Sequence, residues 1–351
     1  MRPRADLVVV GGGPVGLAAA IEGRLAGLSV LLVEPRTGPV DKACGEGLMP
    51  GTVAALDRLG VRVEGASFRG IRYVAPNGRA TTTHLFAAGV GLGVRRTALH
   101  AALAARAAEV GVDQCSGRVK GLRPTQAGRS GMCVELDDGR TLTGDWVLGC
   151  DGLHSTVRRT AGLGRGSDGR RFGIRRHAAC SPWADVVEVH WSAVGEAYVT
   201  PISDREIGVA VLGPRGWSFD EAIATFPALA RQLSGVGWTT SARGAGPLRQ
   251  KVSSPLLGRV LLVGDAAGYV DALTGEGLRI GLACAEAAVA SVVAGRPQDY
   301  PRSWRSLTRD YRWLTSGLVT ATRVPAARRA LVPVAARLPR VFGAAVDTLA
   351  Q

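Results

Sequence analysis

Three glycines near the start of the chain have the spacing of a turn that cradles phosphate groups. Gly11, Gly13 and Gly16 follow an apolar run at residues 6–10 and precede an Ala-rich stretch up to residue 27. Gly11 permits a tight turn after a strand, Gly13 lets the backbone approach a pyrophosphate, and Gly16 lets the next helix pack closely on the strand. The free N–H groups at the start of that helix favour an anion. The pattern predicts a dinucleotide-binding βαβ unit.

An acidic residue follows the next apolar run, at the position where such a unit binds ribose. The run covers residues 29–33 and is followed by Glu34 and Pro35. A carboxylate there accepts hydrogen bonds from ribose hydroxyls and disfavours a 2′-phosphate. FAD or NAD therefore fits this position, whereas NADP does not.

The composition narrows the class of protein. Of 351 residues, 46% are hydrophobic and 21% are charged, which is typical of a globular chain with one large α/β unit or two domains. No run of about 18 apolar residues occurs, so we expect no transmembrane segment. The net charge is +14, but nearly all cations are arginines spread along the chain. Because no nucleic-acid-binding motif accompanies them, we expect no nucleic-acid partner.

The cysteines and histidines have no spacing that suggests a metal site. The six cysteines contain no CxxC pair, so neither zinc nor a disulfide framework is indicated. Four histidines, His100, His154, His177 and His190, are expected to have satisfied polar roles rather than metal ligands. We expect a cytoplasmic protein.

Two later segments carry further motifs at the ends of expected strands. A hairpin at residues 132–143 leads to a strand at 146–149, which is followed by the sequence DGLHSTVR from Asp151. A buried strand at 260–263 is followed by GDAAG from Gly264, and TGEG then precedes an Ala-rich helix from about residue 278 to 294.

With these motifs the sequence resembles the flavoproteins of the para-hydroxybenzoate hydroxylase superfamily, and within it the geranylgeranyl reductase-like branch. The segments DGxxSxVR and GDAAG…TGEG are similar to its flavin motifs. Residues 93–103 resemble its Arg-containing helix start, and residues 42–47 resemble its Cys-Gly loop. The resemblance covers residue 6 to about residue 294. It implies FAD as cofactor and NAD(P)H as electron donor, either directly or through a partner flavin reductase.

The dinucleotide pattern and the resemblance together assign a set of residues to FAD. In the resembling proteins the GD carboxylate, here Asp265, binds the ribityl chain, and a helix N-terminus near the flavin stabilises negative charge on it. The assigned residues are Gly11, Gly13, Pro14, Gly16, Glu34, Pro35, Lys42, Gly45, Arg96, Asp151, Gly152, Gly264, Asp265, Gly275 and Gly277.

Two residues of the Cys-Gly loop are candidates for catalysis. The resemblance implies that Cys44 lies near the reacting face, where it would donate a proton; the alternative is a small buried apolar residue. A reactive thiol would need an electropositive neighbour, which Lys42 would supply. Glu46 is a further proton donor if burial raises its pKa.

We predict an α/β fold in three parts. The first is a Rossmann-like FAD-binding domain, three-layered with a parallel sheet and a β-meander, at residues 1–66, 91–165 and 246–297. The second is an inserted antiparallel β-sheet substrate domain at 67–90 and 166–245, with strands expected at 67–75, up to 85, and at 185–195, 196–202 and 206–212. The third is a C-terminal helical tail at 298–351.

The strand at residues 196–201 is the expected contact with a small organic substrate. Alternation places Glu196, Tyr198 and Thr200 on one face, which faces either the substrate or solvent. We assign Tyr198, Thr200 and Pro201 to substrate binding. Prenyl reductases of the branch carry Tyr-x-Trp-x-Phe-Pro at this strand, and its absence argues against a long isoprenoid substrate.

Other family signatures are also missing. The Trp-x-Trp-x-Ile-Pro segment of flavin halogenases does not occur, which disfavours halogenation. Gly268 and Ala272 stand where many hydroxylases carry His and Pro, which weakens a standard aromatic hydroxylase interpretation without excluding oxygenation.

The last 50 residues are rich in arginine and have helical periodicity. Trp304, Leu307, Tyr311 and Leu314 share one apolar face, and prolines at 325, 333 and 339 are expected to break the segment into short pieces. We favour a helical cap on the flavin domain over a peripheral membrane surface of basic amphipathic type.

Two reactions and one non-redox alternative follow from this pattern. We favour a monooxygenase that hydroxylates or epoxidises a small organic substrate through a flavin C4a-hydroperoxide, because the prenyl-binding pattern is absent. The first alternative is an ene reductase of prenyl type, in which hydride goes to a C=C bond and Cys44, Glu46 or water gives the proton. The second is an FAD-bound scaffold or cyclase without redox turnover.

Overall fold

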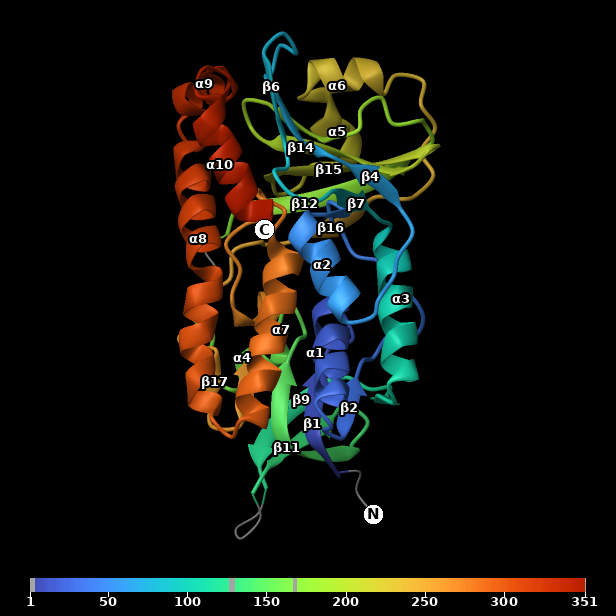
Figure 1. Cartoon of the computed structure of the whole chain (residues 1–351), viewed down its shortest axis with the longest axis vertical. Helices are drawn as coiled ribbons and strands as arrows, with labels where there is room; N and C mark the ends of the chain where they lie inside the picture. The colour runs from blue at the N-terminus through green and yellow to red at the C-terminus, as the bar shows by residue number, and fades with distance from the viewer. Residues whose placement is uncertain (1–3, 126–129, 167–168, 351) are drawn as a thin grey trace.

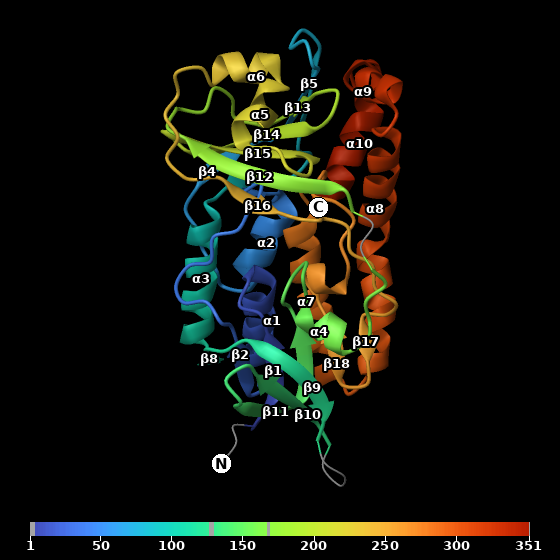
Figure 2. The ribbon, with the colours of Figure 1, turned by 180° about the vertical axis from the view of Figure 1, so that it is seen from behind.

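The computed structural model describes residues 4–125, 130–166 and 169–350. Two sheet-containing parts are stacked along the long axis, and three C-terminal helices run along one side of both (Figure 1). Seen from behind, the same helices flank the upper sheet, and the first strand lies at the opposite end of the molecule (Figure 2). The α/β arrangement with a second sheet and a helical C-terminal segment agrees with the predicted fold class, and the predicted domain bounds stay a prediction.

The lower part in Figure 1 contains a mostly parallel sheet. Its strand order is β17-β18-β11-β1-β2-β8, and β10 and β9 continue from β11 as an antiparallel meander. Its strands are β1 (Arg4–Val10), β2 (Val30–Val33), β8 (Asp113–Cys115), β9 (Val119–Pro124), β10 (Met132–Leu136), β11 (Thr141–Gly149), β17 (Leu256–Leu257) and β18 (Val260–Leu262). Its helices are α1 (Pro14–Leu25), α2 (Pro50–Arg58), α3 (Arg96–Glu109), α4 (Thr156–Thr160) and α7 (Gly277–Val293).

The sequence of β1 explains the layers of this part. Leu7 and Val9 face a core made with α1, α3 and α7, whereas Val8 and Val10 face a second core made with the meander and α4. Because successive side chains point to opposite faces, a strand that is apolar at nearly every position must be covered on both sides. The predicted parallel sheet with a β-meander is confirmed.

The upper part contains a second sheet with the order β16-β12-β15-β14-β13-β5-β6. Helices α5 and α6 cover its outer face. The elements are β5 (Gly70–Val74), β6 (Thr81–Leu85), β12 (Arg171–Ala178), β13 (Val187–Trp191), β14 (Glu196–Ser203), β15 (Glu206–Pro214), β16 (Arg243–Ala245), α5 (Phe219–Ala224) and α6 (Pro227–Gln232). A small third sheet joins β3 (Gly47–Leu48), β4 (Ala66–Phe68) and β7 (Gly91–Gly93).

Four details of the strand prediction need correction. The pair β13 and β5 is parallel, because the chain crosses the first part between them rather than turning in a hairpin. The run 67–75 divides into β4 and β5, which belong to different sheets. The segments 140–143 and 146–149 lie in one strand, β11, and the Arg-rich strand β12 was not predicted.

The C-terminal segment forms α8 (Tyr300–Ala321), α9 (Pro325–Arg337) and α10 (Pro339–Ala350). Two of its prolines begin helices, where a missing N–H is not needed. Pro333 lies inside α9, so the prediction that it breaks the helix is wrong. Helix α8 packs on α7, whereas α9 and α10 pack on β6. The segment therefore covers the upper part as well as the expected lower one.

A buried ionic cluster attaches α9 to the second sheet. The Nη2 atom of Arg328 lies 3.2 Å from Oε1 of Glu196, whose Oε2 lies 2.6 Å from Nη2 of Arg171. Arg171 also pairs with Asp271 at 2.9 Å. Burial raises the pKa of Glu196 against the pull of both arginines, so the charged carboxylate depends on these cations.

Replacing Arg328 should therefore destabilise the protein. Because Arg328→Met leaves Glu196 with one cation in a buried site, we expect a loss of about 3 kcal/mol in the free energy of unfolding. Denaturant unfolding measures this loss. The neighbouring Arg329 is exposed, so Arg329→Met should change stability by less than about 0.5 kcal/mol. Equal stabilities for the two variants would show that the cluster does not fasten α9.

Candidate active site

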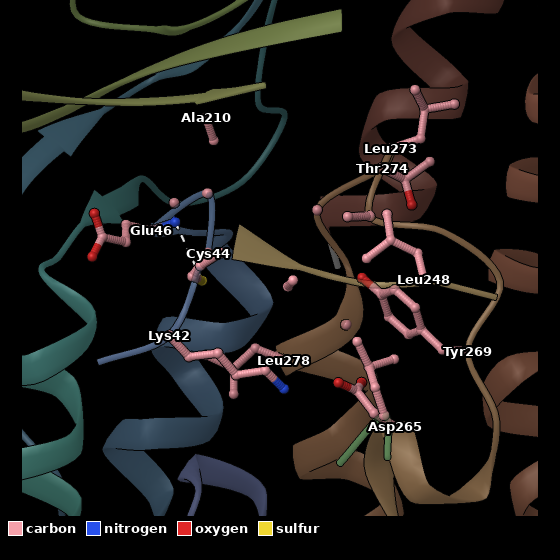
Figure 3. A pocket seen from close by; sticks show the side chains of 18 of the residues that line it. Lys42, Cys44, Glu46, Ala210, Leu248, Asp265, Tyr269, Leu273, Thr274 and Leu278 are labelled. Atoms are coloured by element: carbon pink, nitrogen blue, oxygen red, sulfur yellow. Dashed lines mark hydrogen bonds between the residues drawn. The ribbon is translucent and has the colours of Figure 1, made fainter. Parts of the chain in front are cut away.

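One cavity of about 1150 Å³ lies between the two sheets and reaches the C-terminal helices. The glycine turn after β1 lines one end, and the loop at residues 42–49 crosses its middle. In the close view, Cys44 lies between Glu46 on one side and Tyr269 with Leu248 on the other (Figure 3). Segments far apart in the sequence thus meet around one space.

The structure brings most of the predicted site residues to this cavity. Every residue assigned to the cofactor, to catalysis or to the substrate lines it except Gly16, Gly264 and Pro201. A Cβ on Gly16 would lie 1.8 Å from the Gly11 carbonyl oxygen, so Gly16 serves the close helix–strand contact expected for it. The Pro201 carbonyl packs against Gly93, whereas Tyr198 and Thr200 line the cavity. The assigned roles themselves stay predictions.

The glycine turn has the geometry of a phosphate cradle. Gly11 has φ of +105°, and a Cβ there would lie 2.6 Å from the Cys150 carbonyl oxygen. A Cβ on Gly13 would meet only Nη2 of Arg96, at 3.8 Å. Gly13 therefore leaves its backbone open to the cavity, with a guanidinium close by.

Two buried polar atoms on cavity-lining side chains near this turn lack a partner within the described residues. They are Nε of Arg96, a donor, and Oδ1 of Asp151, an acceptor. The other oxygen of Asp151 already accepts the N–H groups of Thr156 and Val157 at the start of α4. A buried unpaired donor and acceptor suit a ligand that carries both an anion and hydroxyl groups. The residues present therefore fit the phosphates and polyol chain of FAD.

The ribose-binding position is occupied by a side chain in this structure. Glu34 accepts hydrogen bonds from the Gly12 N–H and from three nitrogens of Arg36. Although burial opposes ionisation of Glu34, these bonds hold its pKa below the usual value. A ribose at this carboxylate would displace the exposed side chain of Arg36, which costs little at a surface.

Glu46 holds the loop that carries Cys44. Its φ of +58° lies in the left-handed region, which costs a non-glycine residue of order 1 kcal/mol or more. One carboxylate oxygen accepts the Arg96 N–H at 2.7 Å, and the other lies 2.5 Å from Nε2 of His177. The carboxylate points away from Tyr269 and Leu248 (Figure 3). The geometry indicates an anchor, and the role of Glu46 as a proton donor stays a prediction.

The partner of Glu46 is a residue that the sequence did not single out for the site. Nδ1 of His177 faces the guanidinium groups of Arg95 at 2.6 Å and Arg175 at 3.1 Å. Because those groups only donate, Nδ1 accepts and the Nε2–H donates to Glu46. Arg175 also contacts Asp41. The alternation of Arg171, Gly173, Arg175 and His177 along β12 was the signal that could have found it.

Cys44 presents a thiol to the cavity. Its sulfur accepts the Glu46 N–H at 3.4 Å (Figure 3), and its side chain has accessible surface there. The surrounding protein raises the pKa of the thiol by burial, although Arg96 acts in the opposite direction. The thiol therefore keeps its proton at neutral pH and suits a proton donor better than a nucleophile.

Beyond Cys44 and Tyr269 the cavity is lined mainly by apolar side chains. On the sheet side the lining comes from β5, β13, β14, β15 and the loop before α7. The hydroxyl of Tyr198 on β14 donates to the Leu273 carbonyl of that loop at 2.6 Å. On the helix side the lining residues are Trp313, Leu314, Leu318, Leu331, Val334, Leu338, Val341, Phe342 and Val346. This end of the cavity suits a long apolar molecule.

Comparisons with known proteins support the interpretation of the glycine turn as part of an FAD site. The profile of a family described as FAD binding domain matches residues 4–216. A menaquinone reductase of Mycolicibacterium smegmatis is 30% identical over 89% of this chain and 82% of its own length. A rifampicin monooxygenase of Streptomyces venezuelae is 33% identical, over 45% of this chain and 34% of its own.

A solved structure has the same fold. The crystal structure of a geranylgeranyl bacteriochlorophyll reductase-like protein from Thermoplasma acidophilum is 20% identical, with a TM-score of 0.78 over 95% of this chain and 92% of that one. The predicted fold class and the resemblance to the superfamily and its geranylgeranyl reductase-like branch are confirmed.

Removing the cation at the cradle should weaken cofactor binding. Arg96→Gln keeps a polar side chain but shortens it and removes the charge facing Gly13, so we expect FAD affinity to fall about tenfold to a hundredfold. Titration of flavin-free protein with FAD, followed by flavin fluorescence, measures it. Arg106 lies on the same helix away from the cavity, and Arg106→Gln should bind FAD as the unmodified chain does. Unchanged affinity in Arg96→Gln would remove Arg96 from the cofactor site.

Glu276 should give the flavin-free protein a pH-dependent instability. Burial outweighs the pairing with Arg279 and raises the pKa of Glu276 to about 7. Because the folded state holds this proton more tightly than the unfolded chain, the contribution of Glu276 to stability falls as pH rises from about 4.5 to about 7. Urea unfolding of Glu276→Gln should show an advantage over the unmodified chain that grows across this range and is constant above it. A difference that does not vary with pH would contradict the assignment.

Proposed function

Because the chain belongs to the FAD binding domain family, we propose that it is a flavoenzyme that reduces a carbon–carbon double bond in a long apolar, isoprenoid-type substrate. The coarser activity, an FAD-dependent oxidoreductase, agrees with the sequence-based expectation and with the relatives found. The double-bond reduction is the alternative of the sequence analysis, now preferred to oxygenation.

The observation that carries this proposal is the apolar extension of the cavity. The sequence argued against a long isoprenoid because the strand pattern of prenyl reductases is absent from β14. In this chain α8, α9 and α10 supply the apolar wall instead. A relative named menaquinone reductase, which this chain matches over most of both lengths, supports the same substrate class.

The residues around Cys44 can assist such a reduction. FAD, when bound, supplies the hydride equivalent that one carbon of the double bond must receive. The other carbon needs a proton, and the Cys44 thiol holds one at Sγ, in the middle of the cavity. A substrate that fills the apolar end would displace water from the double bond, so this proton would have few competitors. After the product leaves, the thiolate would regain a proton from solvent. We propose NAD(P)H, directly or through a partner reductase, as the source of electrons.

A second candidate function is oxygenation of a small organic substrate. The similarity to a rifampicin monooxygenase favours it, but that match covers less than half of either chain. The two reactions differ in their products, because a reductase adds two hydrogens without oxygen and a monooxygenase incorporates one atom of O₂.

Substitution of Cys44 tests the proposed reaction. The FAD-loaded protein is reduced without oxygen and given a menaquinone in detergent. The product is reoxidised in air before mass spectrometry, so that any quinol returns to the quinone and only a saturated side chain keeps the added hydrogens. We expect a gain of two hydrogens, with a rate about a hundredfold lower in Cys44→Ala because a positioned acid is lost. Bleaching of the flavin by the electron donor should not change. Cys180→Ala, at a cysteine that does not line the cavity, is the control and should keep the full rate.

Other outcomes of this experiment would contradict parts of the proposed reaction. Product formation only in air, with label from ¹⁸O₂, would favour the monooxygenase. An unchanged rate in Cys44→Ala would show that another group gives the proton. A flavin that the donor bleaches, but that converts none of the substrates tried under either condition, would contradict the proposed substrate class.

A further inference from the structure

The outer surface of the C-terminal helices carries exposed apolar side chains at the edge of the cavity. Trp313 is 75% exposed, Val341 65%, Leu338 52% and Val334 47%. All four also line the cavity, so the apolar lining continues outward to the surface. Large apolar side chains that are exposed together mark a contact surface.

The same helices carry an unusual share of the charge. Residues 300–350 contain nine arginines and only two acidic residues, so they hold half of the chain's net charge of +14. One of the nine, Arg328, belongs to the buried cluster with Glu196. The others are exposed and give this side of the molecule a strong positive charge.

Six of these arginines have no carboxylate within 4 Å in the described part of the chain. They are Arg305, Arg312, Arg323, Arg329, Arg337 and Arg340. Elsewhere on the surface arginines are commonly paired, as Arg123 is with Glu135. Arg337 and Arg340 stand on either side of Leu338 at the junction of α9 and α10, next to Val341. Unpaired cations thus border the exposed apolar side chains.

We propose that this surface, which we call the α8–α10 face, docks on an anionic lipid bilayer. Leu338, Val341 and Trp313 would enter the boundary between headgroups and acyl chains, and the arginines would contact lipid phosphates. Among the described residues, no helix is long and apolar enough to cross a membrane, so the contact is interfacial. The inner side of α8 packs on α7 and forms the helical cap expected from the sequence. The proposed docking surface lies on the opposite side of the same helix.

The position of the cavity suggests how docking would serve the proposed reaction. An isoprenoid dissolved in the bilayer could pass between Trp313 and Val341 into the apolar end of the cavity without crossing water. This use of the surface rests on the proposed function, whereas the docking itself rests only on the exposed side chains and their charge.

Vesicle binding tests the docking without any turnover. The FAD-loaded protein is floated with vesicles of phosphatidylcholine alone and with vesicles that also contain phosphatidylglycerol. We expect binding to the anionic vesicles, weakened by added salt because the arginine contacts are screened. Binding that is equal for both vesicle types, or absent from both, overturns the proposal.

Matched single substitutions locate the surface. Arg340→Gln should weaken binding about fivefold, whereas Arg205→Gln, at an exposed position in the β14–β15 turn, should not. Val341→Glu should weaken it about tenfold or more, because it places a carboxylate in the lipid boundary. Leu25→Glu, at the end of α1 with 51% exposure, is its control. If both members of a pair act alike, another surface binds the vesicles and the proposal fails.

Two further results separate this proposal from its rivals. If the lipid-free protein dimerises and Val341→Glu makes it monomeric, the face belongs to a second copy of the chain and the proposal is overturned. A protein that binds anionic vesicles through this face but reduces no isoprenoid would refute the proposed function and leave the docking intact. A protein that reduces isoprenoids but does not bind anionic vesicles would refute the docking and leave the proposed function intact.

Discussion

The carboxylate of Glu46 is the contact on which the geometry of the site depends. It joins the first turn of α3, through the Arg96 N–H, to β12 of the second sheet, through His177. The loop that carries Cys44 is thereby fixed to both parts of the molecule. Glu46 itself has a left-handed backbone, and a buried charge is costly unless it is paired. The imidazole of His177 and the nearby Arg175 stabilise the buried carboxylate. As a result, the Cys44 thiol lies between the phosphate cradle and the apolar end of the cavity.

Two ionic clusters attach the second sheet to the segments that surround the cavity. One surrounds Glu46, His177 and Arg175, and the other joins Glu196 to Arg171, Asp271 and Arg328. The first holds the sheet over the loop with Cys44, and the second holds α9 and the loop before α7 against the sheet. Between these clusters β13 presents Val187 and Val189 to the cavity, whereas its buried pair of Glu188 and His190 stands at the alternate positions of the strand. The cavity-facing side can therefore accept an apolar molecule.

The parts of the fold that depend on neighbouring residues were predictable, and those that depend on distant pairing were not. The strand, glycine turn and helix at the N-terminus follow from contacts such as Gly16 with Gly11, five residues apart, and most of the motif residues line the cavity. The partnership of Glu46 with His177 spans 131 residues, and β12 is rich in arginine, so local pattern favoured no strand there. The parallel pairing of β5 with β13 is likewise a long-range choice. Pro333 was predicted to break the helix, but α9 continues through it. The apolar wall made by α8, α9 and α10 depends on how the three helices pack together, which the pattern of one segment does not predict.

Helix α8 connects the outer surface to the loop that borders the cofactor end of the cavity. On its inner side the Tyr311 hydroxyl donates to the Asp271 carbonyl at 2.9 Å, and the hydroxyls of Thr315 and Thr274 lie 3.1 Å apart. The loop held in this way runs on to Gly275 and Gly277, which line the cavity. On its outer side the same helix presents Trp313. The same helix thus supplies part of the apolar mouth and, through these two contacts, positions the loop at the cofactor end of the cavity.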